Sequence, residues 1–102
     1  MITLKVVNRH FEGCDVSVAR PTVFGNPHAI GKGCTREQAV ERYRAGLCGD
    51  TVAMLHWKIQ DLKLEVVRLG CWCAPKACHA DVLIDALVNA YPDIYQRETP
   101  TE

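Results

Sequence analysis

Residues 64–73 constrain the fold of this chain most, because they read as a strand with apolar side chains on both faces. Alternation along the strand divides these side chains into two sets: Val67, Leu69, Cys71 and Cys73 on one face, and Val66, Gly70 and Trp72 on the other. A strand that is apolar on both faces belongs in the centre of a sheet. Residues 78–91 follow it with a helical pattern that Pro92 ends, so we expect a strand and a helix packed together.

Two short β-rich runs and two helical patterns precede that strand. Residues 2–7 and 15–19 predict strands, which we expect to lie side by side. Thr35 opens the first helix, because Gln38 three residues later completes a capping box. A second helix begins near residue 50, and its predicted core positions are Val52, Leu55, Trp57, Ile59 and Leu62. The two helices are expected to form an antiparallel pair or a bent connection.

This order of elements predicts a small single-domain α/β sandwich with a short, mainly parallel sheet and about three helices. The 102 residues suffice for one domain, which we place at residues 1–92, followed by a flexible polar tail at 93–102. No apolar run is long enough to span a membrane. Twelve basic residues balance twelve acidic ones, so we expect no non-specific binding of nucleic acid. The first seven residues do not resemble a signal peptide, which predicts a cytoplasmic protein.

The most informative stretch is the junction between the central strand and the last helix. It places thiols and an imidazole together, since Cys71 and Cys73 lie on the strand and Cys78 and His79 on the first helical turn. The first turn of a helix favours anions and lowers the pKa of a nearby thiol. Cys78 is therefore the best candidate for a reactive thiolate, and we expect it to be alkylated faster than Cys48.

Loop residues after the second predicted strand are expected to reach the same edge of the sheet, where α/β proteins bind ligands. Arg20 could clamp an anion, and Asn26 stands in the turn sequence Gly-Asn-Pro beside it. The candidate catalytic residues are Cys78, His79 and Asp81, and the candidate ligand-binding residues are Arg20, Asn26, Cys71 and Cys73. Asp81 could equally serve only to stabilise the helix dipole.

Three other interpretations of the cysteine cluster remain open. Zinc prefers the thiolate and imidazole ligands present at Cys71, Cys73, Cys78 and His79, but adjacent residues at a helix start point about 100° apart. Thiol exchange between Cys71 and Cys73 would strain a disulfide between two residues of one extended strand. Finally, the cysteines could be small buried core residues without a chemical role. The sequence identifies no cofactor.

The run from Leu69 to Leu83, with its Cys-Trp-Cys and Cys-His pairs, resembles the signature of the domain of unknown function 4326 family, small proteins of phages and bacteria. The resemblance extends over about residues 5–88 and includes Asp15-Val16-Ser17-Val18-Ala19-Arg20-Pro21 and Gly25-Asn26-Pro27. It implies a phage or bacterial origin, and it groups Arg20, Asn26, Cys71, Cys73, Cys78, His79 and Asp81 as family positions. It implies no activity, since the family's name records none.

These observations predict a small protein that binds, and could also process, a small anionic ligand such as a nucleotide at the Cys/His-containing helix start. The alternative is a non-catalytic protein that interacts with a host protein and uses the Cys/His cluster as a structural zinc site. Whether the chain is an enzyme stays open. A phage-encoded chain would act in the host cytoplasm.

Overall fold

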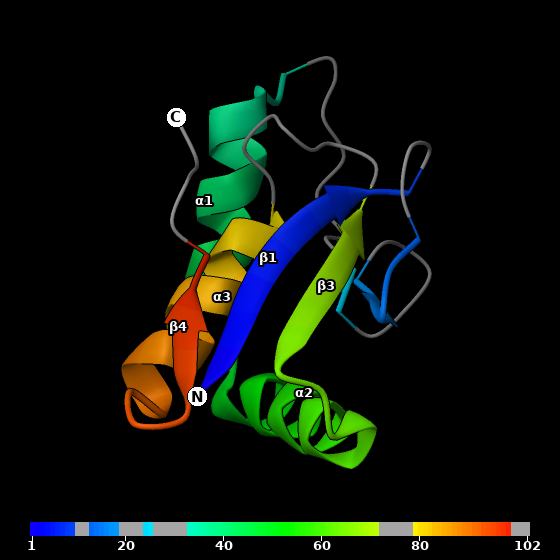
Figure 1. Ribbon diagram of the computed structural model, residues 1–102. Coiled ribbons are helices and arrows are strands. Elements are labelled where there is room, and N and C mark those ends of the chain that lie inside the picture. The colour runs from blue at the N-terminus through cyan, green and yellow to red at the C-terminus, as the bar shows by residue number, and fades with distance from the viewer. Residues whose placement is uncertain (10–12, 19–23, 26–32, 72–78, 99–102) are drawn as a thin grey trace.

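The predicted central strand is β3 (Val66–Cys71), which pairs with a parallel strand on each side. The structure is a computed structural model that describes residues 1–9, 13–18, 24–25, 33–71 and 79–98. β1 (Ile2–Asn8) lies on one side of β3 and β2 (Val16–Ser17) on the other. β4 (Tyr95–Arg97) pairs in parallel with the far edge of β1, which gives the strand order β2-β3-β1-β4 (Figure 1). The predicted α/β fold with a parallel sheet is confirmed.

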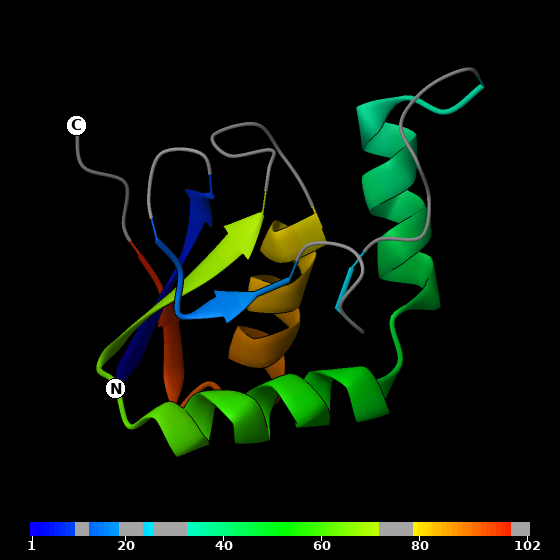
Figure 2. The same ribbon diagram turned by 90° about the vertical axis from the view of Figure 1, so that its right-hand side faces the viewer.

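In the described part of the chain, three helices accompany the sheet: α1 (Arg36–Gly46), α2 (Gly49–Leu62) and α3 (His79–Ala90). α3 packs on one side of the strands, α1 lies beyond α3, and α2 crosses the base of the molecule (Figure 2). Of the two arrangements expected for α1 and α2, the bent connection is the one found. None of the helices in the described ranges has the length and apolar character needed to cross a membrane.

The start of α1 follows from a local sequence signal. The hydroxyl of Thr35 accepts a hydrogen bond from the backbone N–H of Gln38 at 3.2 Å, and the side chain of Gln38 accepts one from the N–H of Thr35 at 2.9 Å. These two bonds are the predicted capping box, which satisfies two donors that a helix start leaves without intrahelical partners.

The core lies between the sheet, α2 and α3. Its largest fully buried side chains are Leu4, Leu55, Ile59, Leu69, Leu83, Ile84, Leu87 and Tyr95. The prediction that Trp57 belongs to this core is wrong, because its side chain is 65% exposed. The side of α2 that faces the core carries Leu55 and Ile59. Trp57 follows Leu55 by two residues, which places it on the opposite side of a helix with about 3.6 residues per turn.

The expectation that the first two strands are neighbours is also wrong, since β3 lies between β1 and β2. β1 and β2 run in the same direction on either side of β3, so the chain that joins them must cross over β3 rather than make a tight turn. It crosses on the face opposite the helices, because Leu69 and Cys71 face the core and Gly70, which points the other way, packs under Cys14. In Figure 1 the strands point upward and α3 lies behind the sheet, so the connection from β3 leftward to β4 is right-handed, as such connections nearly always are. The connection from β1 to β2 runs in the opposite direction on the opposite face and therefore has the same hand.

Residues 95–97, expected to belong to a polar tail, form β4 instead. The N–H of Ile2 donates to Ile94 at 2.8 Å, and the N–H of Glu98 donates to Leu4 at 2.9 Å, so backbone hydrogen bonds fix both ends of this pairing. Tyr95 is buried, and its hydroxyl lies 2.7 Å from Nδ1 of His56 on α2. Residues 99–102 lie outside the described part of the chain.

Candidate functional site

The carboxyl ends of β1 and β3 meet at one edge of the sheet, where Asn8 and Cys71 are partners in the strand register. From this edge the connection after β1 crosses the open face of the sheet, whereas α3, which follows β3, packs on the other face. Two neighbouring parallel strands whose connections leave toward opposite faces create a crevice at their carboxyl ends, and α/β proteins bind ligands there. The site residues predicted from the sequence were expected at this same edge.

Two described side chains line the helix-facing side of this edge. Asn8 alternates with Leu4 and Val6, both of which belong to or pack against the core, so it lies on the face that α3 covers. Cys71 alternates with Val67 and Leu69 on the same face and is almost completely buried. Asn8 was not among the predicted site residues. Its place at the end of an apolar strand run is the signal that could have found it.

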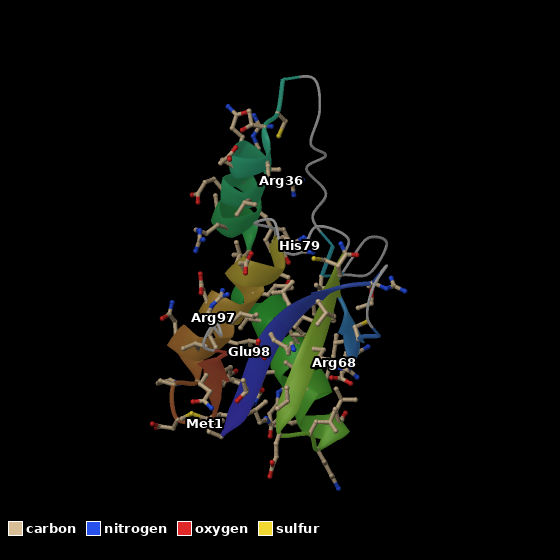
Figure 3. All side chains as sticks on the ribbon, turned by 45° about the horizontal axis from the view of Figure 1, so that its top comes forward. Met1, Arg36, Arg68, His79, Arg97 and Glu98 are labelled. Carbon is tan, nitrogen blue, oxygen red and sulfur yellow. The ribbon has the colours of Figure 1, made fainter. Side chains whose placement is uncertain are left out.

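His79 is buried at the first residue of α3, beside the ends of β1 and β3 (Figure 3). Its Nε2 makes a short hydrogen-bond contact with the backbone carbonyl of Val18, directly after β2. A carbonyl oxygen only accepts, so Nε2 carries the proton, and Nδ1 is the ring nitrogen that can accept one when the imidazole is neutral. His79 therefore ties the start of α3 to the end of β2.

The aromatic ring of Tyr43 on α1 packs edge-on against His79, with ring centroids 5.1 Å apart. The hydroxyl of Tyr43 donates a hydrogen bond to the backbone carbonyl of Phe24 at 2.8 Å. Burial, with a contribution from the charge of Cys48, raises the pKa of Tyr43 to about 12, so the hydroxyl keeps its proton and remains a donor. Tyr43 therefore connects the imidazole of His79 to α1 through its ring and to the backbone at Phe24 through its hydroxyl.

Asp81, the third predicted catalytic residue, points to a different neighbour. Its carboxylate accepts a hydrogen bond from Arg97 of β4 at 3.1 Å, and the same guanidinium donates to Asp85 at 3.1 Å. Arg97 also donates to the backbone carbonyl of Asp81. The structure thus places His79 and Cys71 at the carboxyl edge of the sheet and the carboxylate of Asp81 in an ion-pair cluster that joins α3 to β4.

Four of the seven predicted site residues, Arg20, Asn26, Cys73 and Cys78, lie outside the described residues. Within the described ranges, no group of three or more histidine, cysteine or acidic side chains is arranged to hold a metal ion. Cys71 and His79 are the two described members of the predicted zinc ligand set. The zinc interpretation therefore stays a prediction.

Cys48 is the N-cap of α2, so the expectation that a helix start would distinguish Cys78 from Cys48 rested on a wrong premise. Its exposed thiol lies 3.2 Å from the hydroxyl of Thr51. Hydrogen bonds from the side chain and the backbone of Thr51 lower the pKa of the Cys48 thiol. The sequence signal for this cap is weak, because cysteine is not among the preferred N-cap residues.

We expect iodoacetamide at pH 7 to alkylate Cys48 faster than the buried Cys34 and Cys71 in the native protein. The thiolate is the reactive form, and a lowered pKa increases the thiolate fraction at any pH below it. The variant Thr51→Val removes the side-chain hydrogen bond, so it should raise the pKa and shift the pH profile of Cys48 labelling upward. Mass spectrometry of the labelled peptides measures each rate, and an unchanged profile in Thr51→Val would contradict this account.

Comparison with known proteins identifies relatives of the whole domain. The family model Domain of unknown function (DUF4326) matches residues 4–89. The "Uncharacterized 12.4 kDa protein in nrdA-td intergenic region" of Enterobacteria phage T4 is 32% identical over 95 residues, which cover 92% of this chain and 86% of the phage protein. No solved structure matches the chain.

Proposed function

The chain belongs to the Domain of unknown function (DUF4326) family, and for this member we propose the binding of a small anionic ligand, such as a nucleotide, at the carboxyl edge of the sheet. The observation that carries the proposal is the arrangement at the carboxyl ends of β1 and β3, whose connections leave toward opposite faces. α/β proteins bind ligands at the crevice that such an arrangement creates. The start of α3 at His79 lies beside these strand ends.

The chemistry of this edge favours an anion over a neutral ligand. The first turn of a helix presents backbone N–H groups without intrahelical acceptors and carries a partial positive charge. α3 has three turns, and the hydrogen bond of His79 to Val18 and its ring contact with Tyr43 fix the position of the first turn. A phosphate group is the anion that such helix starts bind in α/β nucleotide-binding folds.

The remaining parts of the proposed site come from the sequence. Arg20 and Asn26 follow β2, whose carboxyl end lies at the same edge of the sheet, so we propose them as ligand contacts. Cys73 is proposed as a further ligand contact, after Cys71 on the same strand run. If the ligand is also processed, Cys78 is the proposed nucleophile or general acid, and Nδ1 of His79 is the proposed proton acceptor.

We expect the melting temperature of the protein to rise in a screen of nucleoside mono-, di- and triphosphates. A ligand that binds only the native state stabilises it by about 2.7 kcal/mol at a hundredfold excess over Kd, which is several degrees for a domain of this size. Arg20→Ala should abolish the shift, because the clamp on the anion is lost. Lys58→Ala is the matched control: it removes an exposed positive charge from α2, at the opposite end of the molecule, and should leave the shift unchanged.

Other outcomes of the screen would contradict the proposal. If no phosphorylated compound shifts the melting temperature and a chelator lowers it, the Cys/His cluster is a structural zinc site, because metal binding of that kind is itself folding free energy. The protein would then be better described as a non-catalytic host-interaction protein. A ligand shift that survives Arg20→Ala would exclude Arg20 as the clamp.

A further inference from the structure

The outer side of α2 carries the largest exposed aromatic side chain among the described residues. Trp57 is 65% exposed, and Met54, one helical turn before it, is 52% exposed. The opposite side of the same helix is buried through Leu55 and Ile59. Isolated exposed apolar residues are normal in soluble proteins, but a tryptophan beside a methionine on one stripe is the composition of binding hot spots.

The indole of Trp57 rests on a rigid base. Its ring contacts the buried His56 edge-on, with centroids 4.9 Å apart. The imidazole of His56 is stacked on Tyr91 at 4.0 Å and bonded to the hydroxyl of Tyr95. Because the indole of Trp57 is already held by these contacts, it loses little conformational entropy when a partner covers it.

Acidic residues flank the apolar pair at both ends of the stripe. With 100° between successive residues, Asp50, Met54, Trp57 and Asp61 fall within one narrow sector of α2, all of them exposed. Asp50 also suits the helix start, but Asp61 lies in the last turn, where a negative charge opposes the helix dipole and no basic residue stands within that turn. The helix dipole therefore favours Asp50 and disfavours Asp61.

We propose that this stripe docks a protein segment whose apolar face is flanked by basic side chains. Charge complementarity selects this occupant, because lysine or arginine at both ends of an apolar anchor would meet Asp50 and Asp61. A second copy of the chain fits poorly: antiparallel pairing of two α2 helices about Met54 and Trp57 sets Asp50 of one copy against Asp61 of the other. Lys58, four residues after Met54 and three before Asp61, borders the stripe.

The test uses the full chain and two fluorescein-labelled model peptides. Both peptides are helical with the same leucine face, which is flanked by lysines in one and by glutamates in the other. We expect fluorescence anisotropy to show binding of the lysine peptide, about tenfold or more tighter than the glutamate peptide. Trp57→Ala should weaken binding about tenfold or more, as truncation of a tryptophan hot spot does. Asp61→Asn should weaken it less and reduce its dependence on salt.

The matched control is Val66→Thr, which removes exposed apolar surface from the start of β3 rather than from α2. It should leave binding of the lysine peptide unchanged, and circular dichroism should show that each variant keeps its helices. Absent binding, equal binding of both peptides, or equal effects of Trp57→Ala and Val66→Thr would overturn the proposal. So would a dimer in analytical ultracentrifugation that Trp57→Ala dissociates, since the occupant would then be a second copy.

Discussion

Replacing Tyr95 with alanine is expected to lower the free energy of unfolding by about 3–5 kcal/mol, the usual cost of truncating a buried aromatic side chain. Tyr95 is 1% exposed and is the only side chain of β4 in the core. Its hydroxyl joins β4 to α2 through Nδ1 of His56 at 2.7 Å and through Gln60 at 3.1 Å. Urea unfolding followed by circular dichroism measures the loss.

Two further variants separate the ring of Tyr95 from its hydroxyl. Tyr95→Phe keeps the ring and should cost about 1–3 kcal/mol, because the buried imidazole of His56 loses its partner. Tyr91→Ala removes a tyrosine that is only partly buried and should cost less than Tyr95→Ala. A loss below about 1 kcal/mol in Tyr95→Ala would show that β4 adds little stability, as expected of the polar tail that the sequence predicts at residues 93–102.

Gly70→Ala is the second substitution with a large expected effect. A Cβ atom at this position would lie 2.5 Å from Sγ and 2.6 Å from Cβ of Cys14, closer than atoms pack. The crossover from β1 to β2 would have to move, and overpacking of this kind costs about 1–3 kcal/mol. Urea unfolding again measures the change.

A double-mutant cycle tests the cause of this loss. Cys14→Gly removes the two nearest atoms that the new methyl group would meet and leaves Cγ of Arg9, the next nearest, at 3.0 Å, so the double variant should recover much of the stability that Gly70→Ala loses. Gly46→Ala is the matched control, because a Cβ there has no neighbour within 4 Å, and it should be neutral or slightly stabilising. Strictly additive effects of Gly70→Ala and Cys14→Gly would exclude the contact as the cause.

The parts of the fold that were predictable depend on local signals. The capping box at Thr35 and the apolar run of β3 each lie within a few residues of the chain, and both predictions are confirmed. The family resemblance built on the same stretch is confirmed as well. These features could be predicted because the residues that signal them are the residues that form them: Thr35 and Gln38 bond to each other, and most of the apolar side chains of β3 become buried.

The remaining features depend on contacts between distant segments. Nothing near Tyr95 shows that His56, 39 residues earlier, provides a buried partner for its hydroxyl, so β4 looks polar in the sequence. The position of β3 between β1 and β2 could not be predicted either. The alternation of apolar and polar residues along one strand shows which face is buried, but not which strands are its neighbours. At the candidate site, the sequence predicted residues at the carboxyl edge of the sheet but missed Asn8, whose place at that edge follows from its register with Cys71.

The pairing of β1 with β4 has a consequence for how the chain folds as it is made. Ile2 is the register partner of Tyr95, so strands near opposite ends of the described chain close the sheet together. A ribosome releases the chain from its N-terminus, and β1 must wait with one edge uncovered until residues 95–97 have emerged. An uncovered strand edge can pair with other chains, so association of nascent chains should be greatest in this interval.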